Sequence, residues 1–92
     1  MAEQEIGVVT HYFDKISVAA IRLTNGALRS GDVIRILGHS TDLEQAVSSI
    51  QIEHSSVTAA KPGDEIGIKV DEPVHEHDKV FKVEDSGDAD VL

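Results

Sequence analysis

Short runs of apolar residues, rich in Val and Ile, follow one another along this chain and are separated by Gly, Pro, Asn and Asp. Runs of this kind predict short β-strands joined by tight turns. Several such strands at regular spacing predict an all-β fold, and we expect a small closed antiparallel β-barrel of six or seven strands, because closure protects the edges that an open sheet exposes. The expected strands are 6–12, 16–23, 32–37, 46–54, 65–70 and 79–83.

One turn motif is repeated. Ser30-Gly31-Asp32 and Pro62-Gly63-Asp64 each precede an apolar strand, and residues 75–78 form a degraded third copy that ends in Asp78. We interpret Gly31 and Gly63 as structural turn residues, because glycine adopts the positive φ angles that tight turns often need. We expect the Asp32 and Asp64 side chains to accept hydrogen bonds from nearby backbone amides. A catalytic set of Asp32, Asp64 and Asp78 is the alternative, and their recurrence at one structural position disfavours it.

The phase of the second strand is ambiguous. Simple alternation places Ile16, Val18 and Ala20 on one face and Ile21 and Leu23 on the other. A bulge near Ala19-Ala20 would turn both sets inward, and a bulge or a close backbone approach is also expected at Gly7. The core predicted in this way consists of Val8, Val18, Ala20, Ile21, Leu23, Leu28, Ile34, Ile36, Val47, Ile50, Ile52, Ile66, Ile68, Val70 and Val80.

The length of the chain and the polar composition of its two ends predict a single folded domain. The chain has 92 residues, and we divide it into a polar lead-in (1–5), a single barrel domain (6–83) and an acidic, disordered tail (84–92). The start lacks the features of a signal peptide, and no apolar run reaches the length of a membrane span. We therefore expect a cytoplasmic protein with no membrane partner.

Charge and composition restrict the possible functions. The net charge is −9, and the aromatic residues are only Tyr12, Phe13 and Phe81, so direct RNA or DNA binding is disfavoured. No phosphate-binding loop motif is present, which argues against nucleotide binding, and no serine lies in a nucleophile elbow. The sequence predicts a protein that is not an enzyme and needs no cofactor.

Four stretches, Gly7-Val8-Val9, 20–38, 47–54 and 61–68, resemble domain II of the translational GTPases, the β-barrel that follows the G domain in elongation factor Tu. They also resemble the small C-terminal barrel of collagenase-like peptidases. The resemblance covers about residues 6–83. It implies the barrel fold without a GTPase domain, and a non-catalytic binding module that docks a protein or ribonucleoprotein partner.

The resemblance also implies a place for binding residues. In elongation factor Tu an acid and an arginine on one strand help to bind the aminoacylated end of tRNA, and the matching positions here hold Gln51 and His54. This difference removes a charge pair suited to that ligand. Independently of the resemblance, Arg22, Arg29 and Arg35 are candidates for a small basic patch on the outside of the barrel, and of these Arg22 and Arg35 are the predicted binding residues. Ion pairing with surrounding acids is the alternative role.

His75 and His77 carry the rival hypothesis of a metal-binding or peptidase-associated accessory domain. On an extended segment these two imidazoles would lie on the same side, as two ligands from one strand do. His11, His39 or His54 would supply a third nitrogen for zinc or nickel. The alternative is a solvated turn in which His77-Asp78 takes the place of Gly-Asp, and the sequence favours it.

Overall fold

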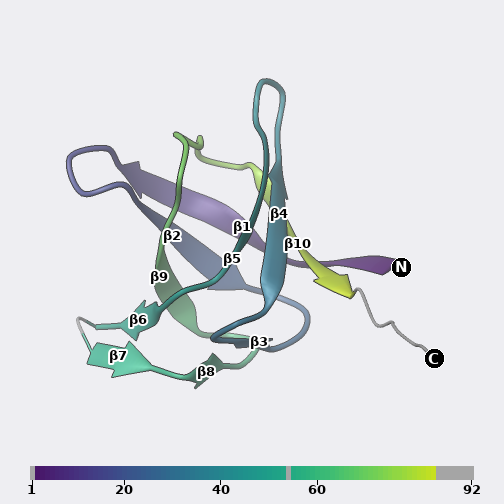
Figure 1. Ribbon diagram of the computed structural model, residues 1–92, viewed down its shortest axis with the longest axis vertical. Coiled ribbons are helices and arrows are strands. Elements are labelled where there is room, and N and C mark those ends of the chain that lie inside the picture. Colours follow the sequence, from purple (N-terminus) through teal and green to yellow (C-terminus); the bar gives the residue numbers. More distant parts are fainter. Residues whose placement is uncertain (1, 54, 85–92) are drawn as a thin grey trace.

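The regular structure consists entirely of β-strands in the described part of the chain. The computed structural model describes residues 2–53 and 55–84 (Figure 1). The strands are β1 (Ala2–Phe13), β2 (Val18–Leu23), β3 (Leu28–Arg29), β4 (Val33–Leu37), β5 (Asp42–Ala46), β6 (Ile50–Ile52), β7 (Ser55–Val57), β8 (Ala59–Ala60), β9 (Glu65–Lys69) and β10 (Lys79–Glu84). Among these residues there is no helix long and apolar enough to cross a membrane. The predicted all-β class is confirmed.

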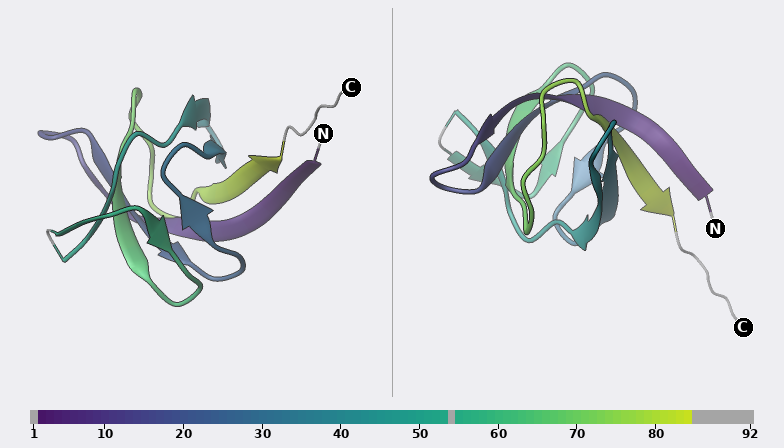
Figure 2. Two further views of the ribbon diagram at one scale, coloured as in Figure 1. Left: turned by 60° about the horizontal axis from the view of Figure 1, so that its bottom comes forward. Right: turned by 90° about the horizontal axis from the view of Figure 1, so that it is seen from above.

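Eight strands form one antiparallel sheet in the order β5-β4-β10-β1-β2-β9-β6-β7, and β3 pairs separately with β8. The sheet curls around a single interior, which gives the barrel shape seen in Figure 2. The strand ladder does not run from β5 to β7. Instead, the side chain of Gln45 on β5 bridges to the end of β9: its Nε2 donates to Lys69 O at 2.9 Å, and its Oε1 accepts from Asp71 N at 2.8 Å. These two hydrogen bonds link β5 to the end of β9, which the strand ladder does not pair with β5.

The strands are shorter and more numerous than predicted. The expected strand 46–54 is divided into β6 and flanking segments, and β5 lies at 42–46, where we expected a polar loop. Only Leu43 of β5 points into the core. The alternation of apolar and polar residues in β5 is therefore weak, and the sequence does not predict this strand. β1 begins at Ala2, so residues 2–5, predicted as a lead-in, pair with β10. Of the predicted tail, Glu84 is the last residue of β10, and residues 85–92 lie outside the described part.

The repeated turn motif has the same geometry in all three copies. The backbone N–H of Asp32, Asp64 and Asp78 donates to the carbonyl oxygen three residues earlier, at 3.0, 3.0 and 3.2 Å. In return, the Oδ2 of each aspartate accepts from the N–H of that earlier residue, at 2.8, 3.0 and 2.8 Å. The residue before each aspartate has positive φ, with values of 98°, 95° and 76°. His77 therefore adopts in the third copy the conformation that glycine adopts in the other two.

β2 alternates regularly, and the expected bulge at Ala19-Ala20 is wrong. The bulges lie in the neighbouring strand β1, where the register shifts between Glu5 and Gly7 and again between Val9 and His11. Gly7 approaches the backbone of β2 so closely that a Cβ there would collide with the carbonyl oxygen of Arg22. Because β1 absorbs the irregularity, β2 keeps strict alternation, with its buried residues on one face and Val18 and Ala20 on the other.

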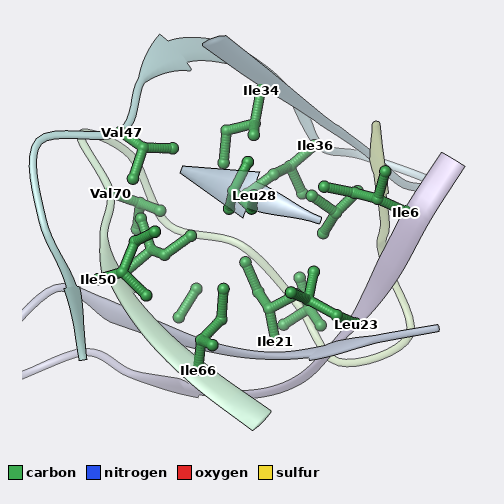
Figure 3. Close-up of a cluster of buried hydrophobic side chains, with 14 of the residues drawn as sticks. Ile6, Ile21, Leu23, Leu28, Ile34, Ile36, Val47, Ile50, Ile66 and Val70 are labelled. Carbon is green, nitrogen blue, oxygen red and sulfur yellow. The ribbon is translucent and has the colours of Figure 1, made fainter. Parts of the chain in front are cut away.

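The core is built from aliphatic side chains of almost every strand, which point into one interior (Figure 3). Most of the predicted core is buried, but Val8, Val18, Ala20 and Ile52 are only partly buried. Val8, Val18 and Ala20 face outward because of the strand phases set by β1. The prediction missed Ile6, Val9, Ala19, Leu43, Ala60 and Val74, all of which are buried.

We predict that Gly31→Val and Gly63→Val each destabilise the barrel by about 1–3 kcal/mol, because a β-branched residue at these φ angles is strained. Open space surrounds both positions, so the loss would arise from the backbone and not from a collision. Urea unfolding measures it, with Gly31→Asn as the control, because asparagine tolerates positive φ and should lose less. Equal stability of Gly31→Val and the wild type would contradict the role of this turn.

A second prediction concerns the Gln45 bridge. Gln45→Ala removes both hydrogen bonds to the end of β9 and should lower the free energy of unfolding by about 1–3 kcal/mol. Gln51→Ala is the matched control, because the exposed Gln51 side chain should cost less than about 0.5 kcal/mol. Similar losses for the two variants would show that the bridge does not hold the barrel together.

Candidate binding groove

An open groove of about 680 Å³ lies on the outer face of β2, β9 and β6. Its floor follows from the strand register: Ala20 is opposite Gly67, and Gly67 is opposite Gln51. Two of these three positions carry little or no side chain, and this leaves a hollow between the larger residues on either side. The outward phase of β2 therefore creates the groove.

Large apolar side chains line one end of the groove. Phe13 and Ile16 belong to the hairpin between β1 and β2, and they are 46% and 61% exposed. This hairpin is the purple-to-blue loop that extends away from the barrel in Figure 1. Val18 continues the same apolar surface along β2. Exposed large apolar residues that adjoin a hollow are typical of a surface that binds another molecule.

The Phe13 ring is held by a neighbour. His11 packs against it edge-on, with 4.5 Å between the ring centroids and an interplanar angle of 63°. The Nδ1 atom of His11 in turn lies 3.0 Å from Glu76 Oε2 in the loop before β10. Aromatic pairs prefer this edge-to-face arrangement. The Phe13 ring, which lines the groove, is thus packed against a residue of its own strand.

Three acidic residues, Glu53, Asp64 and Glu65, line the opposite end of the groove. Asp64 is engaged in its turn, and Glu65 Oε2 accepts a hydrogen bond from Thr10 Oγ1 at 3.2 Å. Glu53 lies in the turn directly after β6 and has a φ of +50°. Arg22 faces Glu65 across the β2–β9 ladder and lies on the same outer surface, beside the lining residues. The lining itself contains three acids and no base.

Arg35 lies on a different part of the sheet, because β10 and β1 separate β4 from β2. Its guanidinium donates to both carboxylate oxygens of Asp42, at 3.1 and 3.2 Å, and to Glu3 Oε2 at 3.2 Å. The hydrogen bonds to Asp42 and then to Glu3 raise the pKa of Arg35 above its ordinary value. Arg35 is therefore ion-paired within the chain and forms no basic patch with Arg22.

His75 and His77 lie in a turn, so the extended segment on which the metal hypothesis depends is not formed. His75 Nδ1 is 2.9 Å from Thr41 Oγ1 and 3.8 Å from Asp78 Oδ2. The backbone N–H of His77 donates to Val9 O at 2.8 Å. Within residues 2–53 and 55–84, no three His, Asp or Glu side chains gather in a way that could hold a metal ion. These contacts join the loop before β10 to the barrel.

Of the binding residues inferred from the sequence, Gln51 lines the groove, and Arg22 lies beside it. His54 lies outside the described residues. Sequence reasoning missed Phe13 and Ile16, the most exposed apolar side chains of the groove. The sequence does contain a signal for their exposure. Phe13 and Ile16 flank the polar pair Asp14-Lys15, and a turn this short cannot bury the apolar residues on both of its sides.

The barrel and its repeated Gly-Asp turns are those of a module of the translation-factor type. Residues 17–73 match the family described as elongation factor Tu domain 2, and the chain belongs to that family.

The similar proteins are peptidase-related. An uncharacterized protease of Methanocaldococcus jannaschii is 40% identical over 83 residues, which cover 89% of this chain and 20% of that protein. A collagenase of Porphyromonas gingivalis is 35% identical over 78 residues, which cover 84% of this chain and 22% of the collagenase. This chain therefore spans about a fifth of the length of these relatives.

Solved structures show the same fold. The C-terminal domain of a putative U32 peptidase from Geobacillus thermoleovorans superimposes with a TM-score of 0.81 at 21% sequence identity, covering 88% of this chain and 93% of that domain. The selenomethionine variant of that domain gives a TM-score of 0.78. The predicted resemblance to both elongation factor Tu domain II and the C-terminal barrel of collagenase-like peptidases is confirmed.

A third prediction tests whether the apolar end of the groove serves the fold. We expect Phe13→Ser combined with Ile16→Ser to change the free energy of unfolding by less than about 1 kcal/mol, because both side chains are largely exposed. Ile21→Ser is the contrasting variant, because Ile21 is fully buried, and it should unfold the barrel or cost several kcal/mol. A loss in the double variant as large as that of Ile21→Ser would assign these residues to the core.

Proposed function

We propose that this protein is a non-catalytic accessory module that docks a protein partner through the groove on β2, β9 and β6. The observation that carries the proposal is the hollow between Phe13, Ile16 and Gln51, which combines exposed apolar surface with an aromatic ring packed against a neighbour. A few residues in well-packed pockets, aromatic side chains prominent among them, contribute most of the binding energy at many protein interfaces.

The arrangement of the polar side chains supports binding over catalysis. The three repeated aspartates each accept a hydrogen bond from the backbone of their own turn. The imidazole of His75 lies against Thr41, and that of His11 lies between Phe13 and Glu76. These groups orient and stabilise the fold. A nucleophile and base facing a common open site would be the arrangement that favours an enzyme.

A peptidase-associated setting for this module is supported by the relatives, which are named a protease, a collagenase and a putative U32 peptidase. In that setting the barrel binds a substrate protein, or another part of the assembly, and leaves peptide cleavage to a separate domain. The hypothesis that this module binds a metal ion through His75 and His77 is not supported by the positions of these two residues. A protein partner is favoured over RNA because the lining carries three acids.

A fourth prediction tests docking. Affinity capture with the wild-type chain should retain a protein from a nuclease-treated extract of the source organism. The retention should fall at least tenfold for Phe13→Ser with Ile16→Ser, because the apolar anchors are removed. A control substitution at Ile52 would disturb the packing, because Ile52 is partly buried. The control is therefore Thr58→Ser, which changes an exposed residue outside the groove, and this variant should still retain the partner. Quantitative mass spectrometry measures the retained protein.

Two results would overturn docking through the groove. One is equal retention by the wild type and the double variant. The other is retention from an untreated extract that is absent from the nuclease-treated one, which would assign the surface to RNA.

A further inference from the structure

The two ends of the groove differ in chemistry, and this difference specifies a ligand. The hairpin end presents Phe13, Ile16 and Val18, and the opposite end presents Glu53, Asp64 and Glu65. We infer that the groove takes an extended peptide segment whose apolar side chain fills the hairpin end and whose Lys or Arg reaches the acidic end. The inference rests on the proposed docking function and gives the chemistry of the docked segment.

The strand register supplies the spacing. Val18 faces Lys69 and Arg22 faces Glu65 across the β2–β9 ladder, so the apolar and acidic ends are separated by four residues of β2. Strand residues rise by about 3.3 Å each, which makes this separation about 13 Å. An extended ligand that lies along β2 would therefore carry its apolar and basic side chains about four residues apart. The small floor formed by Ala20 and Gly67 leaves room for the ligand backbone between them.

Charge favours a cationic ligand over a phosphate-bearing one. The charged residues that line the groove are acidic, with Glu53 and Glu65 at one end. Arg22 and Lys69 lie on the same outer face beyond the lining, so the surface around the groove carries charges of both signs. The whole chain carries a net charge of −9, which attracts cations and repels phosphates over long range. A ligand ammonium or guanidinium would replace water around Glu53 and Glu65 without displacing the turn bond of Asp64.

Synthetic peptides test the inference with the intact chain. The probe is a fluorescein-labelled peptide, Ser-Leu-Leu-Ser-Gly-Ser-Arg-Ser, in which the second leucine and the arginine are four residues apart. The first comparison peptide has glutamate in place of arginine, and the second has serine in place of both leucines. Fluorescence anisotropy at low salt should show at least tenfold tighter binding of the probe than of either comparison peptide.

Protein variants locate the contacts. Glu53→Lys with Glu65→Lys should weaken binding of the probe at least tenfold, whereas the matched change Glu44→Lys with Glu72→Lys alters exposed acids outside the groove and should not. Ala20→Leu fills the floor and should also weaken binding. Its control, Ala59→Leu, adds the same side chain at an exposed position on β8. Unfolding measurements on each variant separate a lost contact from a lost fold.

The outcomes separate this inference from the proposed function. Equal affinity for the arginine and glutamate peptides, or no effect of Glu53→Lys with Glu65→Lys, would overturn the cationic ligand. If retention of the captured protein still depended on Phe13 and Ile16, docking itself would stand. Tighter binding of a single-stranded RNA hexamer than of the probe would overturn the peptide ligand. If neither peptide binding nor retention of the captured protein depended on Phe13 and Ile16, both proposals would be overturned.

Discussion

A reciprocal pair of hydrogen bonds between an aspartate and the residue three positions earlier sets the corners of this barrel. The pair occurs at Asp32, Asp64 and Asp78, and β4, β9 and β10 each begin directly after one of these turns. Because each turn fixes the direction and phase of the strand that follows, Ile34, Ile66 and Val80 all point inward. The buried interior thus depends on three pairs of polar contacts, two of them exposed and the third, at Asp78, buried, and the rest of the sheet is assembled around the strands that they position.

The features that sequence reasoning predicted well are local. A Gly-Asp pair next to an alternating apolar run contains both the turn chemistry and the strand phase, so β4, β9 and β10 lie close to their expected ranges. The phase of β2 depends instead on bulges in its neighbour β1, and no pattern within 16–23 encodes them. The sequence pattern consequently predicts Val18 and Ala20 in the core, although they form the wall and floor of the groove.

The candidate site could be predicted only in part for the same reason. Family resemblance pointed to Gln51, which lines the groove, but it could not indicate that Arg22 and Arg35 lie on separate parts of the sheet. Phe13 and Ile16 are hydrophobic, and hydrophobic residues are ordinarily assigned to the interior. Their exposure becomes evident only when the hairpin is seen to extend past the edge of the packed core. The binding surface that we propose thus lies where apolar residues extend beyond the interior.

The pairing of β1 with β10 has a consequence for how such a barrel combines with other domains. Ala2 is opposite Glu84, and neighbouring strands are about 5 Å apart. A host polypeptide that enters along β1 and leaves along β10 would therefore need almost no gap between its two connections. The closeness of the two strand ends is therefore compatible with insertion of the barrel into a surface loop of a larger protein as well as with attachment at one end.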